Sequence, residues 1–286
     1  MMKRHVLLMG AAAAVCAFST AWAAPKEIVC AGDYPMHLQG VATDGTSVFW
    51  TFTTALVKTD LDGRLLAKAE RATETAHLGD PCCHGGKVYV GVNNGETGGA
   101  RPGDEVWVYD ARTLALERRH PTPQTIFCNN GLEWYGGHFY VVGSAPHHHD
   151  FNYVWQYSED FRFERCLPIR SGWTHVGVQT ICHLKSIGKV AFGHYGNAGK
   201  KDYVFFVRPE DLVLPPVSAI PDSENARTLE ITGSADWSVA CGMLELDGEI
   251  YKAITERKDG GRWTGRLLPL SAKAAIDTND SALTHK

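Results

Sequence analysis

Histidine is the residue type whose placement in this chain most clearly suggests chemistry. The chain has thirteen histidines, and two of them open similar phrases, HLQGVATDGTSVFW from His37 and HLGDPCCHGGKVYV from His77. A neutral imidazole can take up and return a proton near neutral pH, bind a metal ion, or hydrogen-bond a polar ligand. The repeated phrase therefore indicates a candidate functional site at its first residue.

Other polar and aromatic residues take similar places at the entries to apolar segments. The predicted catalytic residues are His37, His77, His175, His194 and Tyr195. The predicted ligand-binding residues are Gln39, Asp80, Asn129, Asn130, Trp173, Gln179 and Asp236. A structural role is the alternative for each of them, because buried polar groups commonly hydrogen-bond the neighbouring backbone.

Three kinds of chemistry fit these residues. A histidine beside a tyrosine, as at His194-Tyr195, could exchange protons with a substrate. Several imidazoles could hold a divalent metal at the centre of the fold, although HExxH is absent and the HxH spacing occurs only at residues 147–149. Amide, imidazole and indole groups could instead recognise a sugar. Paired carboxylates, which most glycosidases need, are scarce, with Asp80 and Asp236 as the inner candidates.

The elements that position these residues are predicted from five repeated turns. Each turn follows an apolar segment and precedes a run of β-branched or aromatic residues, which is typical of a β-hairpin. The turns are Asp44-Gly45, Gly85-Gly86, Gly136-Gly137, Ile187-Gly188 and Asp247-Gly248.

A third strand follows each hairpin, and units one to four also have a fourth, at residues 65–70, 114–120, 161–169 and 229–233. The fifth unit lacks one, and residues 26–32 can supply it by pairing with the strand near residues 262–270. We therefore predict an all-β chain, a five-bladed β-propeller of four-stranded antiparallel blades closed by the N-terminal strand. A β-sandwich is the alternative, but it does not explain why one end lacks a strand.

Such a fold would gather the candidate residues at one mouth of a central channel. The entries to the inner strands share a face with the loops between the second and third strands. Those loops are long, at residues 93–105, 143–152 and 193–202, and long loops on a rigid scaffold commonly carry function. The run His147, His148 and His149 lies in one of them, and His84 is the doubtful member because it lies at the far end of its strand.

The chain ends differ from the predicted domain in composition. Residues 1–23 resemble an export signal, with Lys3 and Arg4 before an apolar run that is too short to span a membrane. Residues 24–270 form the single propeller domain, and residues 271–286 are a polar tail. We therefore expect a periplasmic or secreted monomer.

The charge of the chain excludes some classes of binding partner, and the positions of its cysteines exclude one disulfide. The chain has 32 acidic against 28 basic residues and no basic run, which argues against nucleic acid and anionic membranes as partners. Cys30 and Cys241 are predicted on the outermost and innermost strands of the last blade, too far apart for a disulfide.

A resemblance to known propellers supports the same fold. Residues 37–66 resemble the opening blade of five-bladed and quinoprotein-like propellers. Gln39-Gly40 and the run from Asn130 to Glu133 are similar to phrases of glutaminyl cyclases, which are exported five-bladed propellers of this size. The cyclases carry an acidic residue after the first hairpin where this chain has Trp50 and Thr51, so the resemblance implies the fold and not the activity.

The function that these residues favour is an exported propeller with a small-molecule or oligosaccharide ligand. It would bind a carbohydrate at a histidine-lined channel mouth, or cleave it as a glycan lyase or glycoside hydrolase. The alternative is a non-enzymatic recognition module or scaffold for a protein partner. A metal-dependent or glutaminyl-cyclase-like enzyme is the third hypothesis.

Overall fold

The computed structural model describes residues 25–94, 103–125, 128–144, 149–196, 203–213, 228–239 and 241–270. The predicted export signal, the polar tail and His147 and His148 lie outside these ranges. Within them most residues lie in β-strands, and the one α-helix is the short α1 (Pro209–Leu212). The prediction of an all-β chain is confirmed for the described residues.

The strands form antiparallel groups of four, and all but the last group follow the chain order. The first sheet contains β2 (Leu38–Thr43), β3 (Ser47–Phe52), β4 (Ala55–Asp60) and β5 (Leu65–Glu70). An eight-stranded sheet joins two further groups where β6 and β10 pair in parallel. They are β6 (Ala76–His84), β7 (Lys87–Asn94), β8 (Glu105–Asp110) and β9 (Leu116–Pro121), and β10 (Gly131–Tyr135), β11 (His138–Val142), β12 (Asn152–Tyr157) and β13 (Phe163–Ile169).

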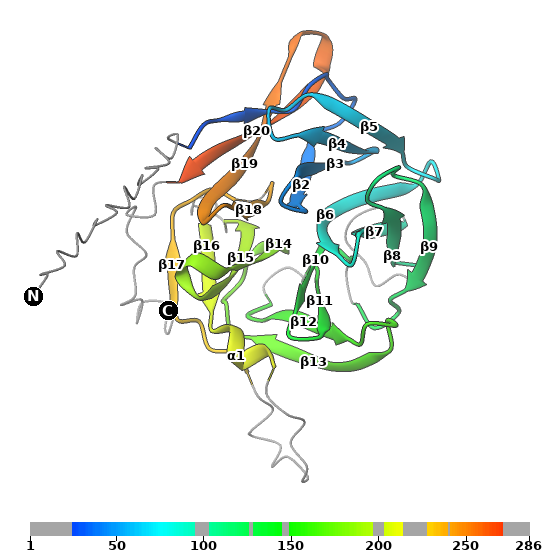
Figure 1. Cartoon of the computed structure of the whole chain (residues 1–286). Coiled ribbons are helices and arrows are strands. Elements are labelled where there is room, and N and C mark those ends of the chain that lie inside the picture. Colours follow the sequence, from blue (N-terminus) through cyan, green and yellow to red (C-terminus); the bar gives the residue numbers. More distant parts are fainter. Residues whose placement is uncertain are drawn as a thin grey trace, which may run out of the picture.

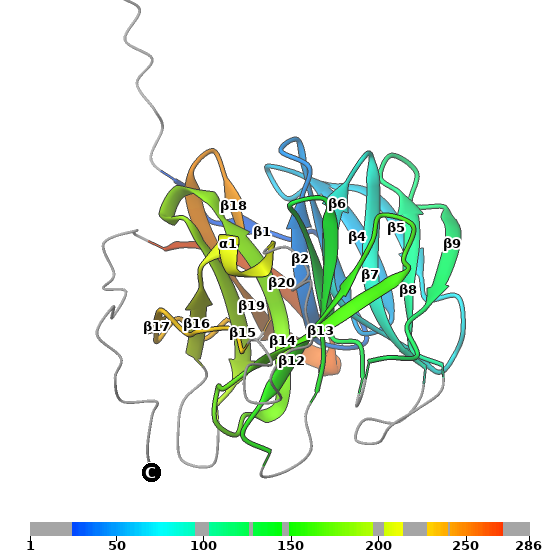
Figure 2. The same ribbon diagram turned by 90° about the horizontal axis from the view of Figure 1, so that it is seen from below.

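Two more sheets complete the arrangement. One contains β14 (His175–Leu184), β15 (Lys189–Tyr195), β16 (Tyr203–Val207) and β17 (Gly233–Ala235). The other has the order β1 (Ile28–Val29), β20 (Trp263–Leu270), β19 (Glu249–Arg257) and β18 (Met243–Leu246). Figure 1 shows the groups around a common centre, with β2, β6, β10, β14 and β18 innermost, and Figure 2 shows them from the side. The arrangement is propeller-like.

The five predicted hairpins are confirmed by strand pairing, β2 with β3 and so on to β18 with β19. At the last turn Asp247 and Gly248 have φ of 52° and 80°, the left-handed conformation of a type I′ turn, whose twist suits a hairpin. The fourth predicted turn differs, because residues 185–187 form a 3-10 turn and Gly188 ends it at φ 59°.

The fourth strand of the fourth unit lies later than predicted. We expected it at residues 229–233, whereas β17 begins at Gly233. Leu229 instead forms a single parallel bridge with Ile169 of β13, and its N–H donates to the Pro168 carbonyl at 2.8 Å. The segment before β17 therefore hydrogen-bonds the preceding sheet before it joins its own.

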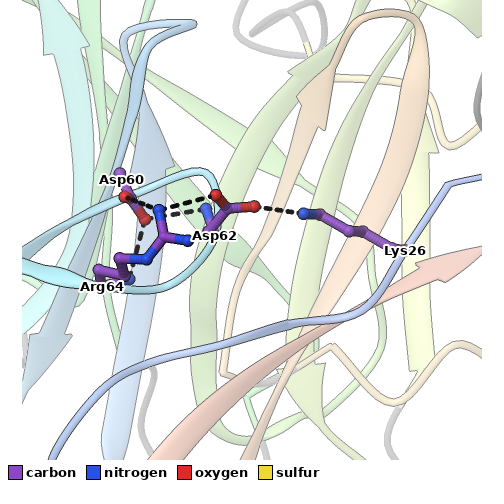
Figure 3. A network of polar contacts seen from close by, with 4 residues as sticks. All are labelled: Lys26, Asp60, Asp62 and Arg64. Carbon is purple, nitrogen blue, oxygen red and sulfur yellow. Dashed lines mark hydrogen bonds and ion pairs between the residues drawn. The ribbon is translucent and has the colours of Figure 1, made fainter.

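The N-terminal strand lies between the last sheet and the first. β1 pairs antiparallel with β20, with Ile28 opposite Leu267. The Ala31 N–H donates to the Gly63 carbonyl at 3.0 Å, in the turn between β4 and β5. Figure 3 shows the ion pairs at this junction, where Lys26 contacts Asp62 and Asp62 contacts Arg64.

Apolar clusters fill the spaces between neighbouring sheets. The largest lies where residues of β1, β2, β3 and β4 meet those of β18, β19 and β20, and it includes Trp50, whose Nε1 donates to Thr59 Oγ1 at 3.0 Å. Cys30 belongs to this cluster and Cys241 packs against it. In the described part of the chain, no helix is long and apolar enough to cross a membrane.

Candidate functional site

A small cavity of about 130 Å³ lies at the mouth of the channel where the inner strands β2, β6 and β14 begin. Six of the predicted site residues line it, and they come from sequence positions up to 158 residues apart. They are His37, Gln39, His77, Asn130, Gln179 and Tyr195. The convergence follows from the fold, because the start of each inner strand points to the same end of the channel.

Irregularities in three inner strands shape this mouth. The ladder between β2 and β3 shifts register between Leu38 and Gly40, which leaves Gln39 out of the pairing. The ladder of β6 shifts between Leu78 and Pro81, and that of β14 shifts twice before Thr180. A bulge re-aims side chains and is common beside functional sites. The bulges explain why consecutive residues at these positions depart from simple alternation.

His37 and Gln39 form a fixed pair at the rim. The Gln39 Nε2 lies 2.7 Å from His37 Nε2 and donates to Thr53 Oγ1 at 3.0 Å. With the amide in this orientation, the His37 Nε2 accepts the hydrogen bond, which assigns the ring proton to Nδ1. His37 also presents its ring edge to Trp263 at a centroid distance of 5.9 Å.

Both rim histidines are neutral at pH 7. Burial, with smaller contributions from the nearby His37 and Arg71, lowers the pKa of His77 to about 4. Burial also lowers the pKa of His37. Neutral imidazoles each offer one donor and one acceptor, so they suit an uncharged polar ligand better than an anion.

Hydrogen bonds hold the amides of the cavity wall in place. Asn130 Nδ2 donates to Ser144 Oγ at 3.1 Å and to the Val178 carbonyl at 2.9 Å. Gln179 Nε2 donates to the Val176 carbonyl at 2.8 Å. Val176 also lines the cavity and has φ 52°, a costly conformation for a β-branched residue. Strain of this kind concentrates at functional sites, which supports the choice of this mouth.

Asp80, which we predicted to bind a ligand at the mouth, does not line this cavity. Its carboxyl group is buried on the channel axis, where Oδ1 accepts from the Val41 N–H at 3.1 Å and Oδ2 from the Ile181 N–H at 3.2 Å. A Cβ on Gly131 would come 2.7 Å from the Asp80 Cβ. Burial holds the pKa of Asp80 well above its usual range. Asp80 therefore ties inner strands together behind the cavity.

His194, predicted to be catalytic, does not line this cavity either. It is fully buried, with its ring 4.0 Å from that of Tyr203 and its Nδ1 2.9 Å from the Tyr195 carbonyl oxygen. Neighbouring residues of a strand point to opposite faces, so Tyr195 and His194 cannot both face the mouth. His175 is exposed outside the cavity, with its ring 6.4 Å from that of Tyr195.

The other three predicted residues lie away from the cavity wall. Asn129 is buried, where its Nδ2 donates to the Glu105 carbonyl at 2.9 Å and holds neighbouring sheets together. Trp173 is half-buried, and its ring lies 6.3 Å from that of His175. Asp236 is exposed immediately after β17. The ligand-binding role of these three residues stays a prediction.

Sequence reasoning missed two polar residues of the wall, Asn93 and Ser144. The Asn93 Oδ1 accepts from the Asn129 N–H at 2.6 Å, and its Nδ2 donates to Asn130 Oδ1 at 3.4 Å. Both missed residues come at the ends of second strands, directly opposite the starts of the inner strands. Looking for polar residues opposite the starts of the inner strands, where the long loops begin, would have found both residues.

A metal centre finds no support in the described residues. Among them, no three His, Cys, Asp or Glu side chains come together as ligands. The described wall of the cavity also contains no carboxylate, which is the usual oxygen ligand for divalent metals. Within the described ranges, the wall therefore offers two imidazoles and no further metal-ligand side chain of these four types.

Comparisons with known proteins bear on the fold. No protein-family model and no curated protein sequence matches the chain. The crystal structure of Myxococcus xanthus glutaminyl cyclase is similar, with 13% identity, a TM-score of 0.51, and coverage of 85% of this chain and 97% of that chain.

Two further structures give weaker matches. Kuenenia stuttgartiensis hydrazine synthase has 10% identity and a TM-score of 0.45, covering 76% of this chain and 63% of that chain. The RRP9 WD40 repeats have 9% identity and a TM-score of 0.47, covering 85% of this chain and 97% of that chain. The likeness to the cyclase shows a β-propeller-like fold, and at that identity it shows nothing further.

Proposed function

We propose that the chain is an exported, five-bladed β-propeller that binds a carbohydrate at the cavity lined by His37 and His77. Five groups of four strands, with β1 beside β20, support the blade number and the closure of the ring. The propeller then acts as a rigid frame that holds the rim residues in fixed positions, which lowers the entropic cost of binding.

The observation that carries this proposal is the neutrality of the cavity wall. Its described side chains offer imidazole, amide and hydroxyl groups, without a carboxylate, lysine or arginine. Such groups match the alternating donors and acceptors of sugar hydroxyls. The cavity, at about 130 Å³, is smaller than the roughly 300 to 1,000 Å³ of a typical small-molecule site. It therefore suits one terminal unit of a glycan.

Binding fits the described wall better than cleavage does. A glycoside hydrolase of the usual type needs two carboxyl groups across the scissile bond, and the described wall contains none. A lyase needs a base whose pKa is near the working pH, whereas the pKa of His77 is about 4. His77 is therefore a weak base, and hydrogen bonding is its stronger contribution.

A glycan-panel measurement tests the proposal. Protein beginning at residue 24 should bind at least one glycan, and His77→Ala should weaken that binding about tenfold, the effect of losing about 1.4 kcal/mol. His138→Ala is the matched control, because His138 lies at the hairpin turn of β11 and pairs with Glu164. The proposal fails if no glycan binds, or if His77→Ala binds as tightly as His138→Ala does.

A glutaminyl-cyclase-like activity is the second candidate. The observation that favours it is the meeting of Gln39 and Asn130, the first residues of the two cyclase-like phrases, in one cavity. The similarity in fold to the Myxococcus xanthus enzyme is consistent with it. The test is cyclisation of a peptide with N-terminal glutamine. Turnover that is lost in Gln39→Ala would support this activity, and no turnover by the unmodified protein would reject it.

A further inference from the structure

A second and larger cavity, of about 380 Å³, lies at the other end of the channel, where β2, β6 and β14 end. Of the described residues, none lines both cavities. Asp80 is buried between them, hydrogen-bonded to Val41 and Ile181, which line the second cavity. Ligand binding at the second cavity can therefore be tested separately from ligand binding at the first.

Part of the wall of this cavity is apolar, and the rest carries polar and charged side chains. The apolar part comes from several inner strands and can contact a short hydrocarbon stem. Its apolar and thiol members include Val41, Pro81, Cys82, Ile181, Cys182 and Leu244. The volume falls in the range of sites that bind small molecules.

Glu133 brings a carboxyl group to this wall. β10 pairs with β6 in parallel at Gly131 and Asp80, which places Glu133 at the level of Cys82. One carboxyl oxygen of Glu133 accepts from the Trp134 N–H at 2.9 Å, and the other accepts from the His183 N–H at 2.9 Å. Two backbone donors thus fix the carboxyl group in a single orientation.

Glu133 makes no ion pair within the described part of the chain, where its hydrogen bonds are all to backbone N–H groups. The titratable groups that face it from β6, β14, the following 3-10 turn and β18 are Asp80, Cys82, Cys83, Cys182, His183, Lys185 and Glu245. Burial raises the pKa of each of the three thiols, so they stay neutral. Burial likewise raises the pKa of Glu133 to about 7, against the smaller opposing effects of the His183 and Trp134 N–H donors and of Lys185.

Charged side chains at the rim of this cavity add to the negative charge of Glu133. Glu245 and Asp247 line the cavity, against Lys185 as its basic residue among those described. Glu245 accepts from the Ser186 N–H at 2.9 Å, so its position is fixed too. A partly desolvated carboxylate is stabilised by a cation placed against it.

We propose that this cavity is a second ligand site, which binds a small organic cation with Glu133 as its counter-ion. The ligand carries a primary ammonium or guanidinium group on a short apolar stem. The stem lies along the apolar wall, and the cation donates to the carboxyl oxygens that the backbone holds in place. An inorganic cation would leave the apolar wall unused, and a neutral alcohol would leave the carboxylate without a counter-charge.

The probe for the test is n-butylammonium chloride, with 1-butanol as its uncharged counterpart, titrated by calorimetry or NMR. We expect saturable binding of butylammonium that is at least about tenfold tighter than that of butanol. The affinity should rise from pH 6 to pH 8, because the carboxyl must be ionised to pair with the cation. Glu133→Gln should weaken butylammonium binding about tenfold or more, and Glu117→Gln, an exposed carboxylate on β9, should leave it unchanged.

A measurement on the unmodified protein covers the case in which Glu133→Gln does not fold. The carboxyl pKa of Glu133, followed by carbon NMR, should fall when butylammonium saturates the site and should not move with butanol. The proposal is overturned if butylammonium does not bind saturably, if butanol binds equally well, or if the Glu133 titration ignores the cation.

Discussion

The pKa of Glu133 makes the stability of the fold depend on pH in a defined direction. Burial raises this pKa from the usual 4.5 to about 7, so the folded state favours the protonated carboxyl. The stabilising effect of protonation is fully present below pH 4.5, is lost as pH rises toward 7, and changes no further above that. Glu133→Gln, which keeps a neutral side chain of the same shape, should abolish this dependence.

The size of the effect follows from the same two pKa values. Each tenfold change in an acid constant is worth about 1.4 kcal/mol, which sets an upper bound of about 3 kcal/mol for this carboxyl. Glu133 as a residue is partly exposed to the cavity, although its carboxyl lies deep in the wall. We therefore expect about 2 kcal/mol between pH 5 and pH 8 after allowing for solvent screening.

The assay is urea unfolding of the unmodified protein and Glu133→Gln at pH 5 and pH 8. At each pH the free energy of unfolding of the unmodified protein is subtracted from that of the variant. This difference should be about 2 kcal/mol larger at pH 8 than at pH 5. Glu117→Gln serves as the control, because it neutralises an exposed carboxylate that does not line this cavity. The reasoning is refuted if the difference in unfolding free energy between Glu133→Gln and the unmodified protein stays constant within about 0.5 kcal/mol over this pH range.

Three other predictions concern separate parts of the molecule. Gly63→Ala should destabilise the protein by about 2 kcal/mol more than Gly45→Ala. Both glycines have similar positive φ, but only a Cβ at Gly63 meets the backbone of Val29 in β1. Equal melting temperatures of the two variants would contradict this. In an NMR titration His77 should remain neutral down to about pH 4. Its contribution to stability is therefore present above pH 6.5 and is lost as pH falls toward 4. A titration midpoint near 6.5 would show that the imidazole is solvated. Asp80→Ala should cost about 2 to 4 kcal/mol in urea unfolding because it leaves two buried N–H donors without an acceptor, whereas Asp80→Asn, which retains one acceptor, should cost about half as much.

The sequence by itself predicted the hairpins and their order. Turn pairs such as Gly85-Gly86 and Asp247-Gly248 have a local cause, because both central residues must take positive φ. The pairing of residues 28–29 with β20 was also predictable, since the fifth unit lacked a fourth strand. The convergence of His37, His77 and Gln39 followed from the repeat, which puts equivalent residues at equivalent positions.

Only the tertiary structure decided which way several side chains point. Bulges in β2, β6 and β14 change the alternation of side chains at the mouth, and a bulge depends on the pairing of the whole strand. Asp80 therefore turns onto the channel axis, and His194 is buried against Tyr203. The cavity around Glu133 was likewise hidden in the sequence, because its walls come from strands far apart in the chain and its desolvation exists only once those strands have packed.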